Sequence, residues 1–98
     1  MYAIIWTYTT RPGQADAFAE AYGPAGPWAQ LFMSAEGYLG TELMRSEERP
    51  DEFITVDRWD SREAFVAFMA ESGDDYQALD EQHAGLTLIE TRLGAFSL

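Results

Sequence analysis

The sequence holds one histidine, no cysteine and no lysine, so few of its side chains can do acid–base chemistry near neutral pH. His83 is the only side chain expected to titrate there. It continues a helical stripe with Tyr76 and Leu79, which would let it face a pocket and accept a proton. A histidine at the end of a helix is also favoured by the helix dipole. Both interpretations stay open, and His83 is the candidate catalytic base.

Arg58 is the candidate cation for steadying a substrate anion. It follows Asp57 in a segment rich in β-branched residues, so the two charges lie on opposite faces of a strand. Each needs a partner if both faces are covered. Glu42, Glu90 and Arg92 raise the same question on other segments. These charged residues either form ion pairs across the sheet or across a dimer interface, or they contact a ligand in a pocket.

Aromatic residues make up 14% of the chain. At strand or helix spacing such rings are typical of a packed core, but they also suit the mostly apolar pocket that a small flat ligand needs. Breaks at 23–27 and 72–75 could open a cleft beside them. Tyr8 belongs to the same set of rings. The candidate substrate-binding residues are Trp6, Tyr22, Trp28, Phe32, Trp59, Phe65, Phe68 and Tyr76.

The residue composition and motifs give little support for a bound metal or a common cofactor. One histidine and no cysteine cannot build a histidine-rich or thiolate metal site. Asp74-Asp75 is adjacent but lacks calcium-loop spacing, and it suits the start of a helix better. No phosphate-binding loop, dinucleotide fingerprint or nucleophile elbow is present. We therefore expect neither a metal nor an organic cofactor.

The net charge is −11, from 17 acidic residues against six arginines. Such a field repels nucleic acids and anionic membrane surfaces, so neither is expected as a partner. No apolar run approaches the length of a membrane span. The first residues lack the basic region and cleavage site of a signal peptide, and we expect a cytoplasmic location.

Four strands and two interrupted helical regions are predicted in alternation. Val, Ile, Thr and aromatic residues mark the strands, and apolar residues every three or four positions mark the helices. Gly23 to Pro27 must break the first helical region, and Asp60 to Glu63 resembles a capping box that opens the second. The predicted strands are 2–10, 38–45, 52–59 and 86–93, and the predicted helical pieces are 14–22, 28–35 and two running from about 61 to 84 around the break at 72–75.

This order predicts one α+β domain over residues 1–98, a ferredoxin-like βαββαβ sandwich with a four-stranded antiparallel sheet. Helices can cover only one face of such a sheet. Apolar residues make up 47% of the chain, and the strands are not cleanly polar on either face. A homodimer that pairs the open sheet faces would bury the excess.

Two segments, EGYLGTEL and ITVDRWDSREAFVAFM, resemble the antibiotic biosynthesis monooxygenase family. The positions that carry the resemblance are Glu36, Gly37, Tyr38, Trp59, Ser61, Ala64 and Phe65. The resemblance implies the dimeric α+β barrel fold. Some members of the family oxygenate aromatic polyketides or quinols without metal or flavin, and another branch degrades haem.

The sequence departs from both branches at informative positions. Phe68 stands where many members have a histidine after the strand tryptophan. The haem-degrading branch has an asparagine near Thr7, a tryptophan at Phe68 and a haem-ligating histidine near Ala78, and none of these is matched. Haem degradation is therefore not expected.

The resulting hypothesis is a cofactor-independent monooxygenase acting on a small phenolic or quinol-like aromatic. His83 would take the phenol proton and Arg58 would steady the anion. A non-catalytic protein of the same fold that binds a small aromatic molecule is the alternative. Isomerase or lyase chemistry is a third hypothesis, because fold alone does not choose among reactions.

Overall fold

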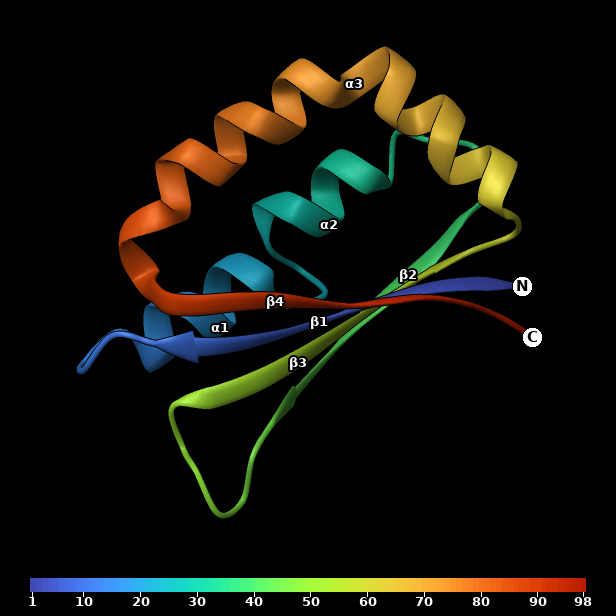
Figure 1. The fold of residues 1–98 in the computed structure, drawn as a ribbon. Helices are drawn as coiled ribbons and strands as arrows, with labels where there is room; N and C mark the ends of the chain where they lie inside the picture. The colour runs from blue at the N-terminus through green and yellow to red at the C-terminus, as the bar shows by residue number, and fades with distance from the viewer.

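The structure is a computed structural model that describes all 98 residues. Its four strands are β1 (Tyr2–Thr10), β2 (Tyr38–Arg45), β3 (Glu52–Trp59) and β4 (Thr87–Ser97). They form one antiparallel sheet in the order β2-β3-β1-β4 (Figure 1). This confirms the predicted α+β ferredoxin-like fold. The first three strands have the predicted bounds, whereas β4 runs four residues further because it pairs with β1 to the end.

The helices are α1 (Ala15–Tyr22), α2 (Pro27–Phe32) and α3 (Arg62–His83), with a short 3-10 turn over Ala84–Leu86. The break before α2 is as predicted, and Pro27 occupies its first turn. A Cβ on Gly26 would lie 2.4 Å from two carbonyl oxygens of the preceding turn, so only glycine fits there. Helices α2 and α3 arch over one face of the sheet (Figure 1).

The second helical piece was predicted to reach Ala35, and it ends at Phe32. The Ser34 hydroxyl donates a hydrogen bond to the Leu31 carbonyl at 2.7 Å, and the Ser34 amide donates to the same oxygen. A serine side chain that occupies a backbone acceptor in this way competes with the helical pattern. The chain therefore tightens into turns before β2.

Helix α3 begins one residue later than the predicted capping box requires. Ser61 is the cap, and its hydroxyl accepts the Ala64 amide at 3.1 Å, which leaves Glu63 at the second helical position. The predicted interruption at 72–75 is a bend and not a gap. Only Ser72 departs from helical geometry (φ −121°, ψ 16°), and Asp74 and Asp75 continue the helix beyond it.

Gly37 allows the start of α3 to pack against the chain that leads into β2. Its φ of +87° is a left-handed conformation, and a Cβ there would lie 2.7 Å from the Ala64 Cβ. The Asp60 amide donates to the Gly37 carbonyl at 2.7 Å. The resemblance placed Gly37 among its defining positions, and the structure gives the physical reason for glycine.

The core lies between the sheet and the helices and is mostly aromatic. Residues from β1, β3 and all three helices meet there, and the largest of the fully buried side chains is Trp59. The core residues are Ile4, Tyr8, Phe18, Ala21, Tyr22, Trp28, Phe32, Phe53, Trp59 and Phe68. The Phe18 ring of α1 lies 4.9 Å from the Tyr8 ring of β1 and 4.8 Å from the Phe53 ring of β3, centroid to centroid, which joins α1 to this layer.

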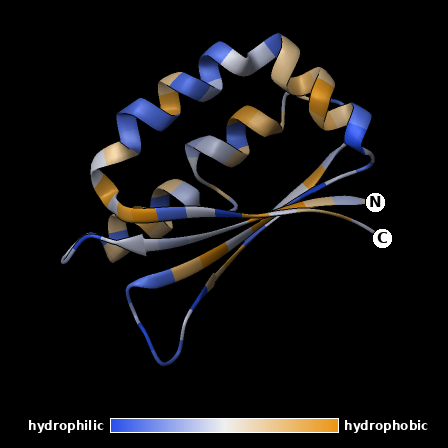
Figure 2. Cartoon of the chain, in the orientation of Figure 1, coloured by the Kyte–Doolittle hydropathy of each residue, from blue (hydrophilic) through white to orange (hydrophobic).

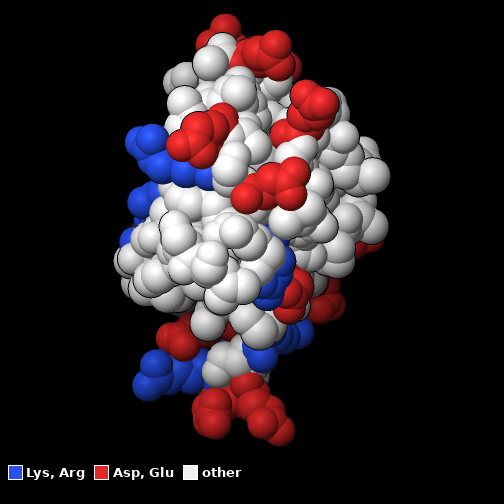
Figure 3. All heavy atoms as spheres, turned by 90° about the vertical axis from the view of Figure 1, so that its right-hand side faces the viewer, with Lys and Arg blue, Asp and Glu red and all other residues white.

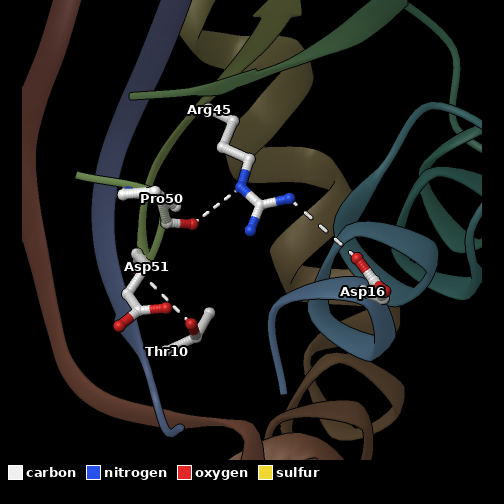
Figure 4. A network of polar contacts seen from close by, with 5 residues as sticks. All are labelled: Thr10, Asp16, Arg45, Pro50 and Asp51. Carbon is white, nitrogen blue, oxygen red and sulfur yellow. Dashed lines mark hydrogen bonds and ion pairs between the residues drawn. The ribbon is translucent and has the colours of Figure 1, made fainter. Parts of the chain in front are cut away.

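A small polar network ties the β2–β3 turn to its neighbours (Figure 4). The Arg45 side chain donates to the Pro50 carbonyl at 2.7 Å and approaches Asp16 of α1 at 3.9 Å. The Thr10 hydroxyl donates to the Asp51 carbonyl at 3.3 Å. The turn itself is hydrophilic (Figure 2). These contacts hold the hairpin against β1 and α1.

The opposite face of the sheet carries no helix. Four large apolar side chains, Met44, Ile54, Ile89 and Phe96, are exposed on it, and we call this set the outer apolar face. Acidic side chains are spread over α3, whereas acidic and basic side chains mix at the β2–β3 turn (Figure 3). None of the helices has the length and apolar character that crossing a membrane requires.

Candidate functional site

A cavity lies between the helix side of the sheet and helices α1, α2 and α3. Strands β1, β2, β3 and β4 all contribute to its lining. Its residues are Trp6, Tyr8, Tyr22, Trp28, Phe32, Thr41, Thr55, Asp57, Tyr76, Asp80 and Glu90. The cavity has a volume of about 30 Å³, within about 430 Å³ of empty space that includes its open mouth. The interior is narrow and holds about two waters.

Aromatic rings build most of the cavity wall. Trp28 of α2 meets Tyr76 of α3 edge to face, with centroids 4.7 Å apart. Tyr22 lies 5.5 Å from Trp28, and Trp6 stacks beside Tyr8 at 6.2 Å. Edge and face contacts at these distances are favourable, so the wall is stable without a ligand. A flat ring could replace part of this stacking if Tyr76 moved aside.

Asp57 supplies the carboxylate of the cavity. It sits on β3, directly across from Thr41 of β2, whose hydroxyl donates to the Asp57 carboxylate at 2.7 Å. The Tyr38 hydroxyl is hydrogen-bonded to the Thr41 hydroxyl in turn. No arginine forms an ion pair with Asp57. Burial raises the pKa of Asp57 to about 6, since loss of water disfavours the charged form.

Three buried polar atoms on cavity-lining residues have no hydrogen-bond partner in the protein. They are the Tyr22 hydroxyl, the Trp28 ring N–H and the Thr55 hydroxyl. Each residue is more than nine-tenths buried. A buried polar group without a partner is costly, and such groups call for a water or a ligand. All three belong to residues that line one cavity, which makes this cavity the candidate binding site.

The mouth of the cavity is acidic. Asp80 of α3 and Glu90 of β4 line both the cavity and a shallower depression outside it. Both residues are exposed, and the Thr87 hydroxyl donates to the Glu90 carboxylate at 3.1 Å. Partial burial raises the pKa of Asp80. A ligand that enters here passes between two carboxylates.

The structure brings five of the eight predicted substrate-binding residues together in the cavity lining, namely Trp6, Tyr22, Trp28, Phe32 and Tyr76. The other three lie outside it. Trp59 and Phe68 are buried in the core with centroids 5.4 Å apart, and Phe65 packs against Trp59 at 5.5 Å. The role of these three residues in substrate binding stays a prediction.

His83 ends α3 just outside the cavity lining. Its Nδ1 lies 2.8 Å from the Leu79 carbonyl, which places the ring proton on that nitrogen and leaves Nε2 free. The ring approaches Tyr22 at 6.1 Å and Trp28 at 6.4 Å. The helix-end position is the one that the sequence offered as the alternative to a pocket base.

Arg58 lies on the other face of the sheet. Neighbouring strand residues point to opposite sides, so Asp57 toward the cavity puts Arg58 away from it. Its guanidinium forms an ion pair with Glu42 of β2, which supports the cross-sheet pairing given as the alternative. A role with a substrate anion in the cavity stays a prediction that this placement does not favour.

The sequence reasoning missed Thr41, Thr55, Asp57, Asp80 and Glu90 as site residues. Asp57 and Glu90 had been noted as charges that need partners, but not as parts of a site. The available signal was the alternation of side chains along a strand. Asp57 is two residues from Thr55 and from the core residue Trp59, so all three side chains lie on the same face of the sheet. Nothing in the sequence alone placed Asp80 opposite β4.

Comparison with known proteins identifies the family. The sequence profile of the antibiotic biosynthesis monooxygenases matches residues 1–82. The chain belongs to the antibiotic biosynthesis monooxygenase family. The family resemblance inferred from residues 36–71 is thus confirmed. No curated protein sequence matches this member of the family at a significant level.

Solved structures share the fold of this family member at low sequence identity. A Deinococcus radiodurans protein, named as a candidate antibiotic biosynthesis monooxygenase, gives a TM-score of 0.78 at 16% identity, covering 100% of this chain and 92% of its own. SnoaB, a cofactor-independent oxygenase from Streptomyces nogalater, gives 0.72 at 17%, covering 99% and 91%. A Bordetella bronchiseptica protein of the same description gives 0.72 at 22%, covering 99% and 95%.

Proposed function

We propose that this protein is a cofactor-independent monooxygenase that oxidises a small phenol or quinol in the cavity described above. The observation that carries the proposal is Asp57. It is a carboxylate with no cation beside it, its pKa is raised to about 6, and it lies among aromatic rings. A base with a pKa near the working pH is suited to remove a phenol proton. Membership of the family and the shared fold with SnoaB support the reaction type.

The proposed reaction needs only the substrate and oxygen. Asp57 accepts the phenol proton, and the phenolate gives one electron to O₂. The superoxide and the phenoxyl radical combine at a ring carbon to form a peroxide, which recovers the proton from Asp57. Loss of water, made from the terminal peroxide oxygen and the hydrogen on that carbon, leaves a quinone. One phenol and one O₂ thus give one quinone and one water.

The remaining cavity residues have supporting roles in this proposal. The Thr41 hydroxyl holds the Asp57 carboxylate in one orientation through its 2.7 Å hydrogen bond. The Tyr22 hydroxyl and Trp28 N–H are enclosed without a well-aligned partner, and they would donate to a phenolate oxygen or to a peroxide once a ligand displaced the side chains that cover them. Donors fixed in place before the reaction stabilise developing negative charge most effectively. The neighbouring rings exclude water from the radical pair.

Oxygen uptake with a panel of small phenols and quinols tests this function. With ¹⁸O₂, we expect one labelled oxygen in the quinone and one in water, in protein stripped of metal with a chelator and free of flavin absorbance. Binding without oxygen uptake across the panel would instead indicate the non-catalytic alternative. Substrate conversion under nitrogen would indicate an isomerase or lyase.

We also propose that the protein is a cytoplasmic homodimer paired through the outer apolar face. Four large apolar side chains are 36% to 58% exposed there, namely Met44, Ile54, Ile89 and Phe96. Monomeric proteins rarely expose a large apolar patch, and such a patch usually marks an interaction site. The strongly acidic charge argues against nucleic-acid and membrane partners.

Ile89→Glu should convert such a dimer to a monomer, because the new charge would be buried in the interface. Sedimentation velocity measures the change. Val66→Glu is the matched control, since Val66 is 47% exposed but lies on α3, on the helix side of the sheet. A wild-type monomer, or an Ile89→Glu dimer as tight as wild type, would contradict this part of the proposal.

A further inference from the structure

The charged residues that line the cavity are all of one sign. Among its eleven lining residues are three carboxylates, Asp57, Asp80 and Glu90, and no arginine, lysine or histidine. None of the three carboxylates takes part in an ion pair within the chain. The acids are not grouped closely enough to form a metal site. A site built in this way attracts a positive charge and repels a negative one.

The nearest basic residues do not line the cavity, so its lining stays negatively charged. Arg92 lies on β4 across from Trp6, and its charge reaches Tyr76, but it is exposed and does not line the cavity. His83 is directed at the Leu79 carbonyl by its Nδ1. Arg58 lies on the other face of the sheet with Glu42. A carboxylate or phosphate on a ligand would therefore find no charged partner in the cavity.

Besides the carboxylates, two independent features indicate that the cavity binds a ligand. The Tyr22 hydroxyl, the Trp28 N–H and the Thr55 hydroxyl, all on residues that line the cavity, are buried without partners in the chain. Ring faces of tryptophan and tyrosine also surround it, and these attract ammonium groups through their π electrons. Aromatic faces together with carboxylates are the usual surroundings of an organic cation.

We propose that the ligand of this cavity is a phenol that carries a cationic amino group on a short side arm. The phenol hydroxyl meets Asp57, and the ammonium group lies at the mouth between Asp80 and Glu90, which line both the cavity and the depression outside it. That the ligand is a phenol which reacts in the cavity rests on the proposed function. The preference for a positively charged ligand does not rest on it, because binding measurements alone test that preference.

Three ligands with the same ring and a two-carbon arm test the selectivity: tyramine, tyrosol and 3-(4-hydroxyphenyl)propionate. They carry a positive, neutral and negative end at neutral pH. Quenching of Trp6 and Trp28 fluorescence reports binding. At low salt we expect tyramine to bind about tenfold more tightly than tyrosol and the propionate to bind most weakly. Added salt should narrow the difference, because both mouth acids are exposed.

Variants at the mouth locate the effect. Asp80→Asn and Glu90→Gln should each weaken tyramine binding about three- to tenfold and leave tyrosol binding unchanged. Glu71→Gln is the matched control, because Glu71 is an exposed acid of α3 that lines no part of the cavity. Thermal unfolding of each variant verifies that it is folded.

Equal or tighter binding of tyrosol or the propionate would overturn the proposal. So would a tyramine preference that survives in the double variant Asp80→Asn/Glu90→Gln, or the absence of binding by all three ligands. Tyramine preference without oxygen uptake would support the charge selectivity and remove the oxygenase function, so the two proposals fail separately.

Discussion

Asp57→Asn should lower oxygen uptake at least about a hundredfold at neutral pH, because general bases typically contribute factors of this size or more. Asparagine keeps the shape of the side chain and still accepts the hydrogen bond from the Thr41 hydroxyl. It cannot take the phenol proton. The loss should therefore appear in kcat with little change in ligand affinity, as measured with an oxygen electrode and by fluorescence titration.

The pH dependence gives a second readout of the same variant. In the wild type, kcat/KM should rise with pH through a midpoint near 6, as Asp57 loses its proton. This rise should be absent in Asp57→Asn. Asp60→Asn, a change at an exposed acid next to Trp59, serves as the control and should keep the wild-type profile.

The stability of Asp57→Asn should change in the opposite direction to its activity. Asp57 holds its proton more tightly in the folded chain than in the unfolded chain, so the free energy of unfolding falls as pH rises from about 4 to about 6. The asparagine variant lacks this penalty and should be more stable by about 3 kcal/mol at neutral pH and equal near pH 3. Urea unfolding at both pH values measures it.

One pair of results would assign the base elsewhere. If Asp57→Asn keeps most of the uptake while His83→Ala abolishes it, the proton acceptor is His83, as the sequence predicted. His83 would then have to reach the cavity from its place beside Tyr22 and Trp28.

Trp59→Ala should lower the free energy of unfolding by about 3–5 kcal/mol, the cost of removing a large aromatic side chain from a core. Trp59 is completely buried and its ring lies within 5.6 Å, centroid to centroid, of Phe32, Phe68 and Phe65. A small domain has about 5–15 kcal/mol of total stability, so much of the chain should be unfolded at physiological temperature. Urea denaturation followed by circular dichroism measures the loss.

Trp59→Phe is the matched control. It keeps most of the apolar volume and removes a ring N–H that has no partner in the protein, so it should cost about 1–2 kcal/mol and leave oxygen uptake near wild type. A folded Trp59→Phe protein with uptake reduced tenfold or more would show that Trp59 contacts the substrate, which contradicts its placement as a core residue.

The sequence predicted the strands well because their composition is characteristic. Tyr2–Thr10 and Glu52–Trp59 are rich in β-branched and aromatic residues, which favour strands. Helix ends were harder, because they depend on single hydrogen bonds. The Ser34 hydroxyl shortened α2 and the Ser61 hydroxyl capped α3, and several side chains nearby could have done either.

The site was only partly predictable for a related reason. The aromatic residues were recognisable, but ring type alone does not separate a cavity wall such as Trp28 from a core residue such as Trp59. Asp57 and Arg58 are adjacent, and choosing between them requires knowing which face the helices cover. Asp80 and Glu90 line the same cavity because the end of α3 leads through a short turn directly into β4, an arrangement that the sequence alone does not give.

A crystal structure of the protein with bound tyramine tests the central claim most directly. We predict the phenol hydroxyl within hydrogen-bonding distance of the Asp57 carboxylate and the ring between Trp28 and Tyr76. A ring bound instead against Arg58 on the outer sheet face, with the cavity filled only by its own side chains, would contradict the account.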